Sequence, residues 1–201
     1  MLSISILGIK DDKNKLIEID KLNPEYLHLD IMDGRFVSNT VDMFSLPDLN
    51  TAKDIHLMVE DVKAYVELYK KYNPEYITFH VEIGNTKELI EYIHSLGIKV
   101  GLSLKPGTSL EDVKPYLGMV DLVLVMSVEP GKGGQAFITD SIDKVKQLHQ
   151  WRVEKIYNYV IEIDGGINAD TIKLVSECDL FVVGSYITSS DNFEERISSL
   201  K

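Results

Sequence analysis

The sequence has few of the residues that mark secreted, membrane-spanning or nucleic-acid-binding proteins. Its single cysteine, Cys178, cannot form an internal disulfide, which fits a reducing compartment, and we expect the cytoplasm. Lys and Arg number 21 against 32 Asp and Glu, so the formal net charge is −11 and a nucleic-acid partner is not expected. The chain has no run of about 18 apolar residues and no signal-peptide pattern at its start, so we expect no membrane segment.

The length and the remaining composition are those of an ordinary globular chain. Hydrophobic residues make up 44% and charged residues 26% of the 201 positions, which argues against disorder. At about 150 residues per domain, this length favours one domain. Because no linker, low-complexity tract or shift in composition divides the chain, we expect a single domain over residues 1–201.

Short β-branched runs alternate with amphipathic stretches along the whole chain. The runs predict eight strands: Ser3–Leu7, Tyr26–Asp30, Asp54–Met58, Tyr76–Val81, Lys99–Leu104, Leu122–Val128, Val160–Asp164 and Leu180–Val183. Helical spacing and helix-start residues predict helices over Asp61–Asn73, Thr86–Gly97, Ser109–Tyr116, Asp140–Arg152 and Ala169–Cys178. Such alternation forms a parallel sheet, buried either as a closed barrel or as a doubly wound open sheet. Eight evenly spaced units favour a single (β/α)8 TIM barrel.

The second of these units is expected to be shortened. Residues 41–53 contain Pro47 and have little helical periodicity, which predicts a single turn or an irregular crossover in place of a helix. The longest interval, from Val128 to Asp164, is expected to open with a long loop at Glu129–Ile138.

Several of the apolar strands carry polar residues at every second position, and these share one face of the strand. His28 and Asp30 share a face of the second strand, His56 lies in the third, and Asp164 ends the seventh. Active sites of TIM barrels lie at the carboxyl ends of the strands. Two imidazoles and two carboxylates meeting there fit one divalent cation. The alternative, that all four are satisfied interior polar residues, is disfavoured because the pattern occurs on three strands.

Glycine-rich segments follow the last three predicted strands. They contain Gly131, Lys132, Gly133 and Gly134, then Gly165 and Gly166, and finally Gly184 and Ser185. Glycines let backbone N–H groups approach an anion, and TIM barrels often bind phosphate after strands seven and eight. A single glycine-rich segment after a strand is more often just a tight turn. Three of them in consecutive loops predict a phosphate site. Local N–H dipoles and a cation would draw a phosphosugar in spite of the net charge.

The motifs at these positions resemble the ribulose-phosphate 3-epimerase family over nearly the whole chain. They are Ser5–Leu7, Leu27–Val37, His56–Val59, Thr78–Glu82, Gly101–Thr108, Val125–Phe137, Asp164–Ile167 and Gly184-Ser185. The resemblance implies an epimerase of pentose phosphate metabolism with a TIM-barrel fold. Such an enzyme inverts C3 of a ketopentose 5-phosphate and interconverts D-ribulose 5-phosphate and D-xylulose 5-phosphate.

The resemblance also implies roles for individual residues. The family residues matching His28, Asp30, His56 and Asp164 bind one divalent cation, for which Zn, Fe, Mn and Co all remain open. Those matching Asp30 and Asp164 are also the proton acceptor and donor. Ser5, together with His56 and Asp164, is expected to contact the substrate, and the three glycine-rich segments are expected to hold its phosphate. Family members assemble, so we expect a homo-oligomer.

Further interior positions are open to two interpretations. The strand alternation places Met32, Met58 and Met126 on the inner face, where they could line the mouth of the barrel as an apolar layer. Ordinary core packing explains them equally well. His80 and Glu162 are expected either to contact the metal ligands or simply to fill the barrel.

The sequence departs from the family pattern in two regions. Lys132 stands where members usually have Phe, and we expect its side chain to point into solvent rather than to the phosphate. Ser38 stands where they usually have Pro, the usual Phe-Gly pair is altered at Phe44-Ser45, and the stretch from Asn39 to His56 is shorter. These departures leave two other functions open: epimerisation of a six-carbon ketose phosphate such as allulose 6-phosphate, and non-catalytic phosphosugar binding.

Overall fold

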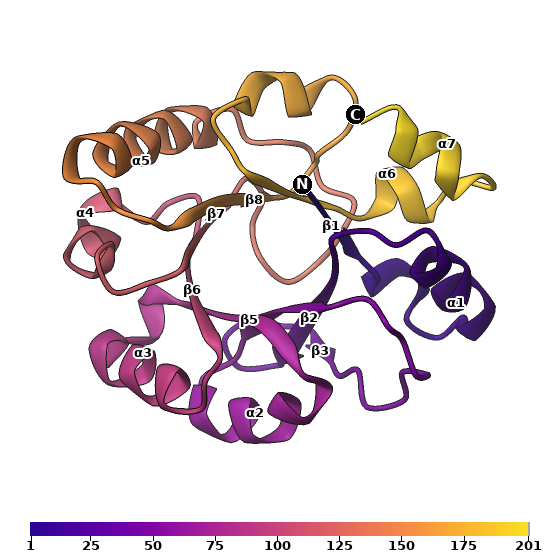
Figure 1. Ribbon diagram of the computed structural model, residues 1–201, viewed down its shortest axis with the longest axis horizontal. Coiled ribbons are helices and arrows are strands. Elements are labelled where there is room, and N and C mark those ends of the chain that lie inside the picture. Colours follow the sequence, from indigo (N-terminus) through magenta and orange to yellow (C-terminus); the bar gives the residue numbers. More distant parts are fainter. Residues whose placement is uncertain (201) are drawn as a thin grey trace.

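The computed structural model, which describes residues 1–200, shows a closed barrel of strands with helices around it (Figure 1). The barrel strands are β1 (Leu2–Ser5), β2 (Tyr26–Asp33), β4 (Lys53–Met58), β5 (Pro74–His80), β6 (Lys99–Leu104), β7 (Leu122–Met126), β8 (Val160–Asp164) and β9 (Leu180–Val183). All are parallel to their neighbours, and β1 pairs with both β2 and β9, which closes the sheet. The expected TIM barrel is confirmed, and each strand lies within three residues of its expected bounds.

Helices pack around the outside of the barrel (Figure 1). They are α1 (Lys13–Lys21), α2 (Val62–Tyr69), α3 (Thr86–Ser95), α4 (Leu110–Val113), α5 (Ser141–Lys155), α6 (Ser185–Thr188) and α7 (Phe193–Ser198). Short 3₁₀ turns occupy Leu7–Ile9, Lys70–Tyr72, Val81–Ile83, Lys114–Tyr116 and Thr171–Val175. The described residues include no helix with the length and apolar character that crossing a membrane requires.

Local side chains determine where several helices begin. Asp61 accepts a hydrogen bond from the N–H of Ala64 at the start of α2, and Ser109 accepts one from Glu111 at the start of α4. Such caps satisfy N–H groups that have no partner within the helix. Asn73, with a left-handed backbone (φ 51°), ends the helical segment before β5. The expected helices at these positions are confirmed.

Two helical segments differ from the sequence-based expectation. The sequence pattern did not predict α1, which is short and mostly polar and buries only Leu16, Ile19 and Asp20. The expected helix over Ala169–Cys178 is instead a 3₁₀ turn at Thr171–Val175. The Asn168 side chain accepts hydrogen bonds from the N–H groups of Asp170 and Thr171 and thereby imposes a tight turn.

The crossover from β2 to β4 contains no helix, as the shortened second unit predicted. A two-residue strand, β3 (Thr40–Val41), pairs antiparallel with the end of β2, and the chain then runs irregularly to β4. Asp20 of α1 accepts hydrogen bonds from the N–H groups of Asn50 and Thr51 at 3.0 and 2.9 Å. The Tyr69 hydroxyl accepts one from the Met43 N–H at 3.1 Å. Side chains therefore satisfy backbone groups that a helix would satisfy internally.

Replacing Asp20 should destabilise this crossover. We expect Asp20→Ala to lower the free energy of unfolding by about 1.5–3 kcal/mol at pH 7. The substitution removes hydrogen bonds to a charged acceptor and leaves two backbone N–H groups without a partner. Asp20→Asn, which keeps an acceptor oxygen, should lose less. Urea unfolding measures both, and an Asp20→Ala protein as stable as wild type would contradict the assignment.

The Asp20 contribution should also depend on pH. Burial raises the pKa of Asp20, but the hydrogen bonds from Thr51 and Asn50 outweigh it, and the net pKa lies below the ordinary 3.8. A carboxyl with a lowered folded pKa stabilises the protein above its unfolded pKa. The stability difference between wild type and Asp20→Ala should therefore be full above about pH 5 and shrink as the pH falls below 3.8.

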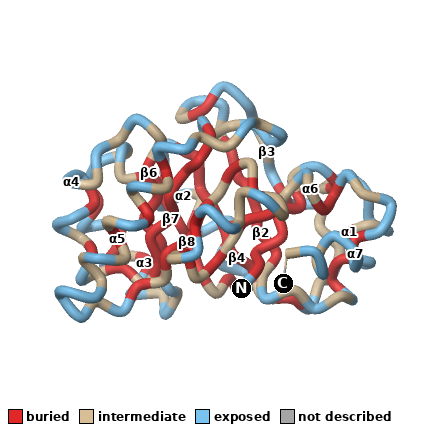
Figure 2. The backbone as a smooth tube through the Cα atoms, turned by 90° about the horizontal axis from the view of Figure 1, so that it is seen from above, coloured by how far each residue is buried: buried red, intermediate tan, exposed pale blue. Residues whose placement is uncertain are grey.

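Buried residues follow the strands and the inner sides of the helices, whereas the outer helix surfaces and loops are exposed (Figure 2). The outward-facing strand residues Leu27, Leu29 and Ile31 join one apolar cluster with helix residues such as Leu16 and Ile19. Many of the inward-facing residues are polar. Those with no exposed surface are Ser3, His28, Asp54, His56, Thr78, His80, Ser103 and Glu162. Along strands such as β2 the alternation thus separates an apolar outer face from a polar inner one. On the side of β7 and β9 the interior is apolar, where Leu122, Leu124 and Leu180 form a cluster of their own.

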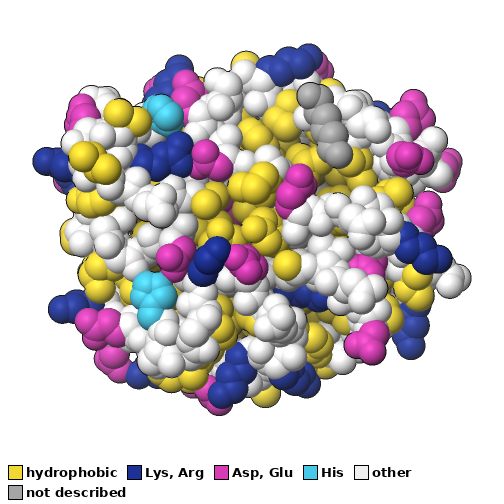
Figure 3. All heavy atoms as spheres, in the orientation of Figure 1, with side chains coloured by type: hydrophobic (Ala, Val, Ile, Leu, Met, Phe, Trp, Pro, Cys, Tyr) yellow, Lys and Arg dark blue, Asp and Glu magenta, His cyan; other side chains and the backbone are white. Residues whose placement is uncertain are grey.

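On the face that Figure 3 shows, acidic and basic side chains alternate around a central group of hydrophobic ones. Since basic groups stand among the acidic ones on this face, the net charge of −11 does not by itself decide which ligands bind at a recessed site.

Candidate metal centre and active site

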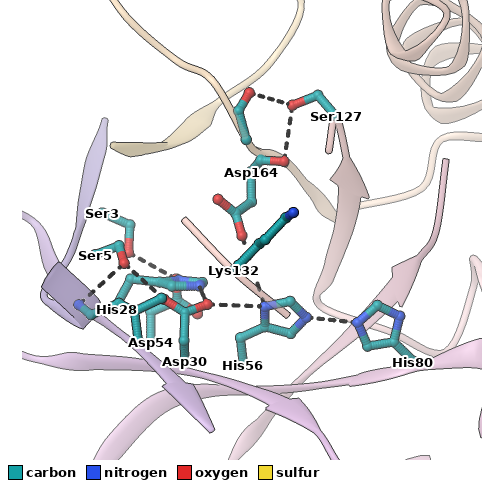
Figure 4. Close-up of polar contacts among 12 residues, drawn as sticks. Ser3, Ser5, His28, Asp30, Asp54, His56, His80, Ser127, Lys132 and Asp164 are labelled. Atoms are coloured by element: carbon teal, nitrogen blue, oxygen red, sulfur yellow. Dashed lines mark hydrogen bonds and ion pairs between the residues drawn. The ribbon is translucent and has the colours of Figure 1, made fainter. Parts of the chain in front are cut away.

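Four polar side chains converge at the carboxyl end of the barrel (Figure 4). His28 and Asp30 come from β2, His56 from β4 and Asp164 from the end of β8. One nitrogen or oxygen of each lies within 4.8 Å of the others. The β2–β4 register sets Asp30 beside His56, and the His56 Nδ1 lies 3.7 Å from Asp30 Oδ1 and 3.9 Å from Asp164 Oδ2. The structure thus brings together all four residues that the sequence pattern grouped.

The ligand atoms of this group fit a divalent cation. Two buried nitrogens, His28 Nε2 and His56 Nδ1, have no hydrogen-bond partner among residues 1–200, although a buried polar atom left unpaired costs about 1–3 kcal/mol. Both face carboxylate oxygens, and His28 Nε2 lies 3.5 Å from Asp30 Oδ1. Atoms about 2.1 Å from a tetrahedral ion lie roughly 3.4 Å apart. Two nitrogens and two oxygens at such spacings suit Zn²⁺, Fe²⁺, Mn²⁺ or Co²⁺.

His28 is held by a buried carboxylate below it. Its Nδ1 donates to Asp54 Oδ2 at 2.7 Å, and the Ser3 hydroxyl donates to the same oxygen at 2.8 Å. Because an ionised carboxylate only accepts, the Nδ1 of His28 carries hydrogen and its Nε2 faces Asp30. Burial lowers the pKa of His28, but the charges of Asp54 and Asp30 outweigh it and raise that pKa well above 6.5. Sequence reasoning assigned no role to Asp54, although its inward position two residues before His56 was a usable signal.

The surroundings of the two aspartates at the mouth shift their pKa values in opposite directions. Burial raises the pKa of Asp30, but His28 and His56 outweigh it and hold that pKa well below its ordinary range. Burial and the negative charge of Asp30 raise the pKa of Asp164 to about 6. The Ser5 hydroxyl donates to Asp30 Oδ2 at 2.7 Å. The pKa values of the two carboxyl groups are therefore shifted in opposite directions, a separation typical of acid–base pairs.

A third carboxyl, Glu162, lies deeper in the barrel. Its side chain groups with His28 and Asp54 within 4.8 Å and has no exposed surface. Burial and the neighbouring charge of Asp54 raise the pKa of Glu162 well above 4.5. The sequence left open whether Glu162 contacts a metal ligand or simply fills the barrel. The structure favours contact, because Glu162 groups with the candidate ligand His28.

His80 lies beside His56 on the side away from Asp164 (Figure 4). The two ring nitrogens are 2.9 Å apart, and His80 Nδ1 lies 3.1 Å from Glu82 Oε2. Burial lowers the pKa of His80 to about 4, so the ring is neutral at physiological pH. Burial raises the pKa of Glu82, but hydrogen bonds, the one to His80 above all, outweigh it and lower that pKa to about 2. His80 thus contacts a candidate ligand directly.

A cavity of about 470 Å³ opens above the four residues. Among the residues singled out by sequence, its walls include Ser5, Asp30, Met32, Met58, Met126, Gly131, Lys132, Gly133, Gly134, Asp164, Gly165, Gly166, Gly184 and Ser185. All three methionines are buried and line it, and Lys132 lines it while remaining exposed. His28 and His56 do not line it, because their rings are fully buried behind the wall.

Glycines are required where two of the wall loops meet. Gly166 has φ +65°, and a Cβ there would lie 2.7 Å from the backbone nitrogen of Phe137. Gly165 has φ +125°, and a Cβ there would lie 2.8 Å from the backbone nitrogen of Val128. Side chains at these positions would therefore strain the backbone and push the loops apart. The wall also includes Ser185 of α6, where the first N–H groups of the helix lack partners within it.

Sequence reasoning missed several cavity residues. Leu7, Gln135, Asn168, Thr171 and Tyr186 also line the wall. Asn168 and Thr171 hold the loop after β8, since the Thr171 hydroxyl donates to the Gly166 carbonyl at 2.9 Å. Leu7 and Gln135 lie within the motifs Ser5–Leu7 and Val125–Phe137, and the other three residues lie close to a glycine-rich segment, so both positions were usable signals.

Fold and site together define a TIM-barrel protein with a candidate His₂Asp₂ cation site beside a glycine-walled cavity. The chain belongs to the ribulose-phosphate 3 epimerase family, whose sequence model matches residues 1–188. It is therefore an epimerase, an enzyme of the isomerase class.

Individual relatives support this membership. Ribulose-phosphate 3-epimerase, cytoplasmic isoform, of Oryza sativa subsp. japonica is 35% identical over 215 aligned positions, covering 100% of this chain and 90% of the rice protein. The ribulose-phosphate 3-epimerase of Treponema pallidum is 37% identical over 180 positions, covering 85% and 82%. Among solved structures, 3-keto-L-gulonate-6-phosphate decarboxylase from Vibrio cholerae has a TM-score of 0.70 at 12% identity, with 100% and 94% coverage. That likeness shows the fold alone.

Proposed function

We propose that this protein inverts C3 of a ketopentose 5-phosphate and so interconverts D-ribulose 5-phosphate and D-xylulose 5-phosphate. The observation that carries the proposal is the pair Asp30 and Asp164, which approach one point from β2 and β8 and line the same cavity (Figure 4). Inversion needs a proton to leave one face of the substrate and another to arrive on the opposite face. Two carboxyl groups from different strands can supply both.

The C3 proton of such a substrate is acidic because it lies next to the C2 ketone. One aspartate, ionised, removes this proton and leaves an enediolate, and the other, protonated, delivers a proton to the opposite face. The two residues exchange roles in the reverse direction. His28, Asp30, His56 and Asp164 would hold a divalent cation, which when bound supplies Lewis-acid stabilisation of the charge on the substrate oxygens.

The cavity walls suit the rest of the substrate. Met32, Met58 and Met126 form an apolar surface near the carboxyl groups, which keeps water from competing for the proton. The loops after β7, β8 and β9 offer glycine backbone to the phosphate. Attraction of the phosphate thus depends on local N–H groups and the cation, not on the net charge of the protein.

Purified protein incubated with D-ribulose 5-phosphate in D₂O tests the proposal. We expect D-xylulose 5-phosphate to form and both sugars to gain deuterium at C3, as seen by NMR. Tight binding without exchange would indicate a non-catalytic phosphosugar-binding protein. A higher kcat/KM for allulose 6-phosphate measured in parallel would assign the six-carbon substrate instead.

Substituting Gly166 should weaken phosphate binding. We expect Gly166→Ala to raise KM about 10- to 100-fold, because the new Cβ displaces the loop and the loss of hydrogen bonds to a charged group costs about 1.5–3 kcal/mol. Gly107→Ala is the control, since a Cβ there meets nothing within 4 Å. Steady-state kinetics with equal KM for both variants would contradict the role of this loop.

Location and assembly stay predictions. The rice relative is a cytoplasmic isoform, whereas a relative from Arabidopsis thaliana is chloroplastic. We propose a cytoplasmic homo-oligomer, which cell fractionation and light scattering of the purified protein would test.

A further inference from the structure

We infer that His80 and Glu82 form a hydrogen-bonded relay that positions His56, determining which of its nitrogens faces the candidate cation site. This inference rests on the proposed function, since it concerns how the proposed ligand set is oriented. The relay runs outward from His56 through His80 to Glu82, over distances of 2.9 and 3.1 Å. The rings of His56 and His80 are stacked, with centroids 5.0 Å apart and planes at 29°.

The direction of the hydrogen bonds follows from the outer end of the relay. The Glu82 carboxylate can only accept, so the Nδ1 of His80 carries a hydrogen. The 2.9 Å contact between the two Nε2 atoms needs one hydrogen, and because His56 Nδ1 has no acceptor within hydrogen-bond distance, that hydrogen lies on His56 Nε2 and His80 accepts it. The remaining nitrogen of His56, Nδ1, is left with a free lone pair directed at Asp30 and Asp164.

The opposite direction leaves two groups unsatisfied. It would place a hydrogen on His56 Nδ1, which lies 3.7 Å from Asp30 Oδ1 and 3.9 Å from Asp164 Oδ2, too far for hydrogen bonds. It would also set the lone pair of His80 Nδ1 against the negatively charged Glu82. Both costs fall on buried atoms, so the relay has one favoured direction.

Glu82 is itself held by the loop after β6. Its second oxygen accepts from the Lys105 N–H at 2.8 Å and from the Thr108 hydroxyl. Lys144 of α5 in turn donates to the carbonyls of Lys105, Pro106 and Thr108 at 3.1, 2.6 and 2.6 Å. The outer end of the relay, Glu82, is therefore fixed by hydrogen bonds to a loop that is itself hydrogen-bonded to α5.

An aromatic side chain covers the relay. The Phe36 ring lies 4.6 Å from the His80 ring, and the Lys105 ammonium lies 3.9 Å from the centre of Phe36. The His80 side chain has no exposed surface, whereas Glu82 is 21% exposed. Water is thereby kept from the His56–His80 contact, which makes its direction depend on the protein groups alone.

The two candidate histidine ligands are thus supported differently. His28 donates directly to Asp54, whereas a neutral ring separates His56 from Glu82. Partners of this kind orient a ligating histidine, and their loss typically costs 10- to 100-fold in metal affinity. His80 is on this account a positioning residue and does not touch the substrate.

Metal affinity tests the relay without any turnover assay. Chelator-treated protein is titrated with Zn²⁺ against a chromogenic chelator. His80→Leu, which cannot accept from His56, should bind Zn²⁺ about 10- to 100-fold more weakly than wild type. His80→Gln, whose amide oxygen can accept, should stay within about threefold of wild type. Ser103→Ala is the matched control, because Ser103 pairs with His80 in the β5–β6 register and is equally buried.

Each outcome of the titration decides one point. Wild-type affinity in His80→Leu would overturn the relay, as would an equal loss in Ser103→Ala. If wild type itself bound no Zn²⁺, the proposed cation site would fail, while the relay would still be decided by NMR. In metal-free, ¹⁵N-histidine-labelled wild type, we expect His56 protonated at Nε2 and His80 at Nδ1. The reverse pattern would overturn the inference.

Discussion

Asp30→Asn and Asp164→Asn should each lower kcat about 10²- to 10⁴-fold, the range that general acid–base groups contribute. An amide of the same size can neither take the C3 proton nor return one, while the barrel around it keeps its shape. Because each aspartate would act as base for only one of the two epimers, each variant should lose C3 deuterium exchange with one epimer and retain part of it with the other.

A matched control separates this loss from damage to the fold. Asp33, at the end of the same strand as Asp30, accepts hydrogen bonds from the N–H groups of Arg35, Phe36 and Glu60 and does not line the cavity. Asp33→Asn should therefore keep near-wild-type kcat. All variants are assayed with saturating metal and known metal content, since both aspartates are also candidate ligands. A near-wild-type rate in either Asp30→Asn or Asp164→Asn would show that the proton-transfer role assigned to it is wrong.

Removal of the divalent cation should have an effect of similar size. Lewis-acid stabilisation is worth several kcal/mol, so chelation should lower kcat on the order of 10³-fold, at 1.36 kcal/mol per tenfold. One equivalent of Zn²⁺, Mn²⁺, Fe²⁺ or Co²⁺ should restore it. Mg²⁺ should restore little, because it prefers oxygen ligands in octahedral geometry and two of the four candidate ligands are imidazoles.

Cation binding should also be visible in stability. An ion that binds only the folded protein stabilises it by RT ln(1 + [L]/Kd), so the Tm of chelator-treated protein should rise as Zn²⁺ is added. His28→Ala should abolish this rise, because it removes a nitrogen that faces Asp30. Full activity in protein that elemental analysis shows to be metal-free would contradict the proposed role of the cation.

Much of the barrel could be predicted because its repeats are local. Each strand is a short, largely apolar run, and the alternation of apolar and polar residues in the second strand places His28 and Asp30 on the same face. The short polar helix α1 could not be predicted in the same way. Its apolar stripe is only two residues long, and most of its stabilisation comes from packing Leu16 and Ile19 onto the barrel.

The sequence predicted which residues form the site, but not which of their atoms contact one another. Alternation indicates which side chains point inward, yet the inward set also includes Asp54, His80 and Glu162, which the pattern does not rank. Their roles depend on which atoms approach within hydrogen-bond distance. Asp54 meets His28 across 26 positions of sequence, and Ser5 meets Asp30 across 25.

The sequence by itself determined the eight units, the inward alternation and the glycines where loops must pass close to one another, because these depend on each residue's own geometry and its near neighbours. Only the tertiary structure decided the register that sets Asp30 beside His56, the opening of the cavity and the direction of the His56–His80–Glu82 hydrogen bonds. Those features depend on distances between strands, and such distances are set when the whole sheet closes and packs.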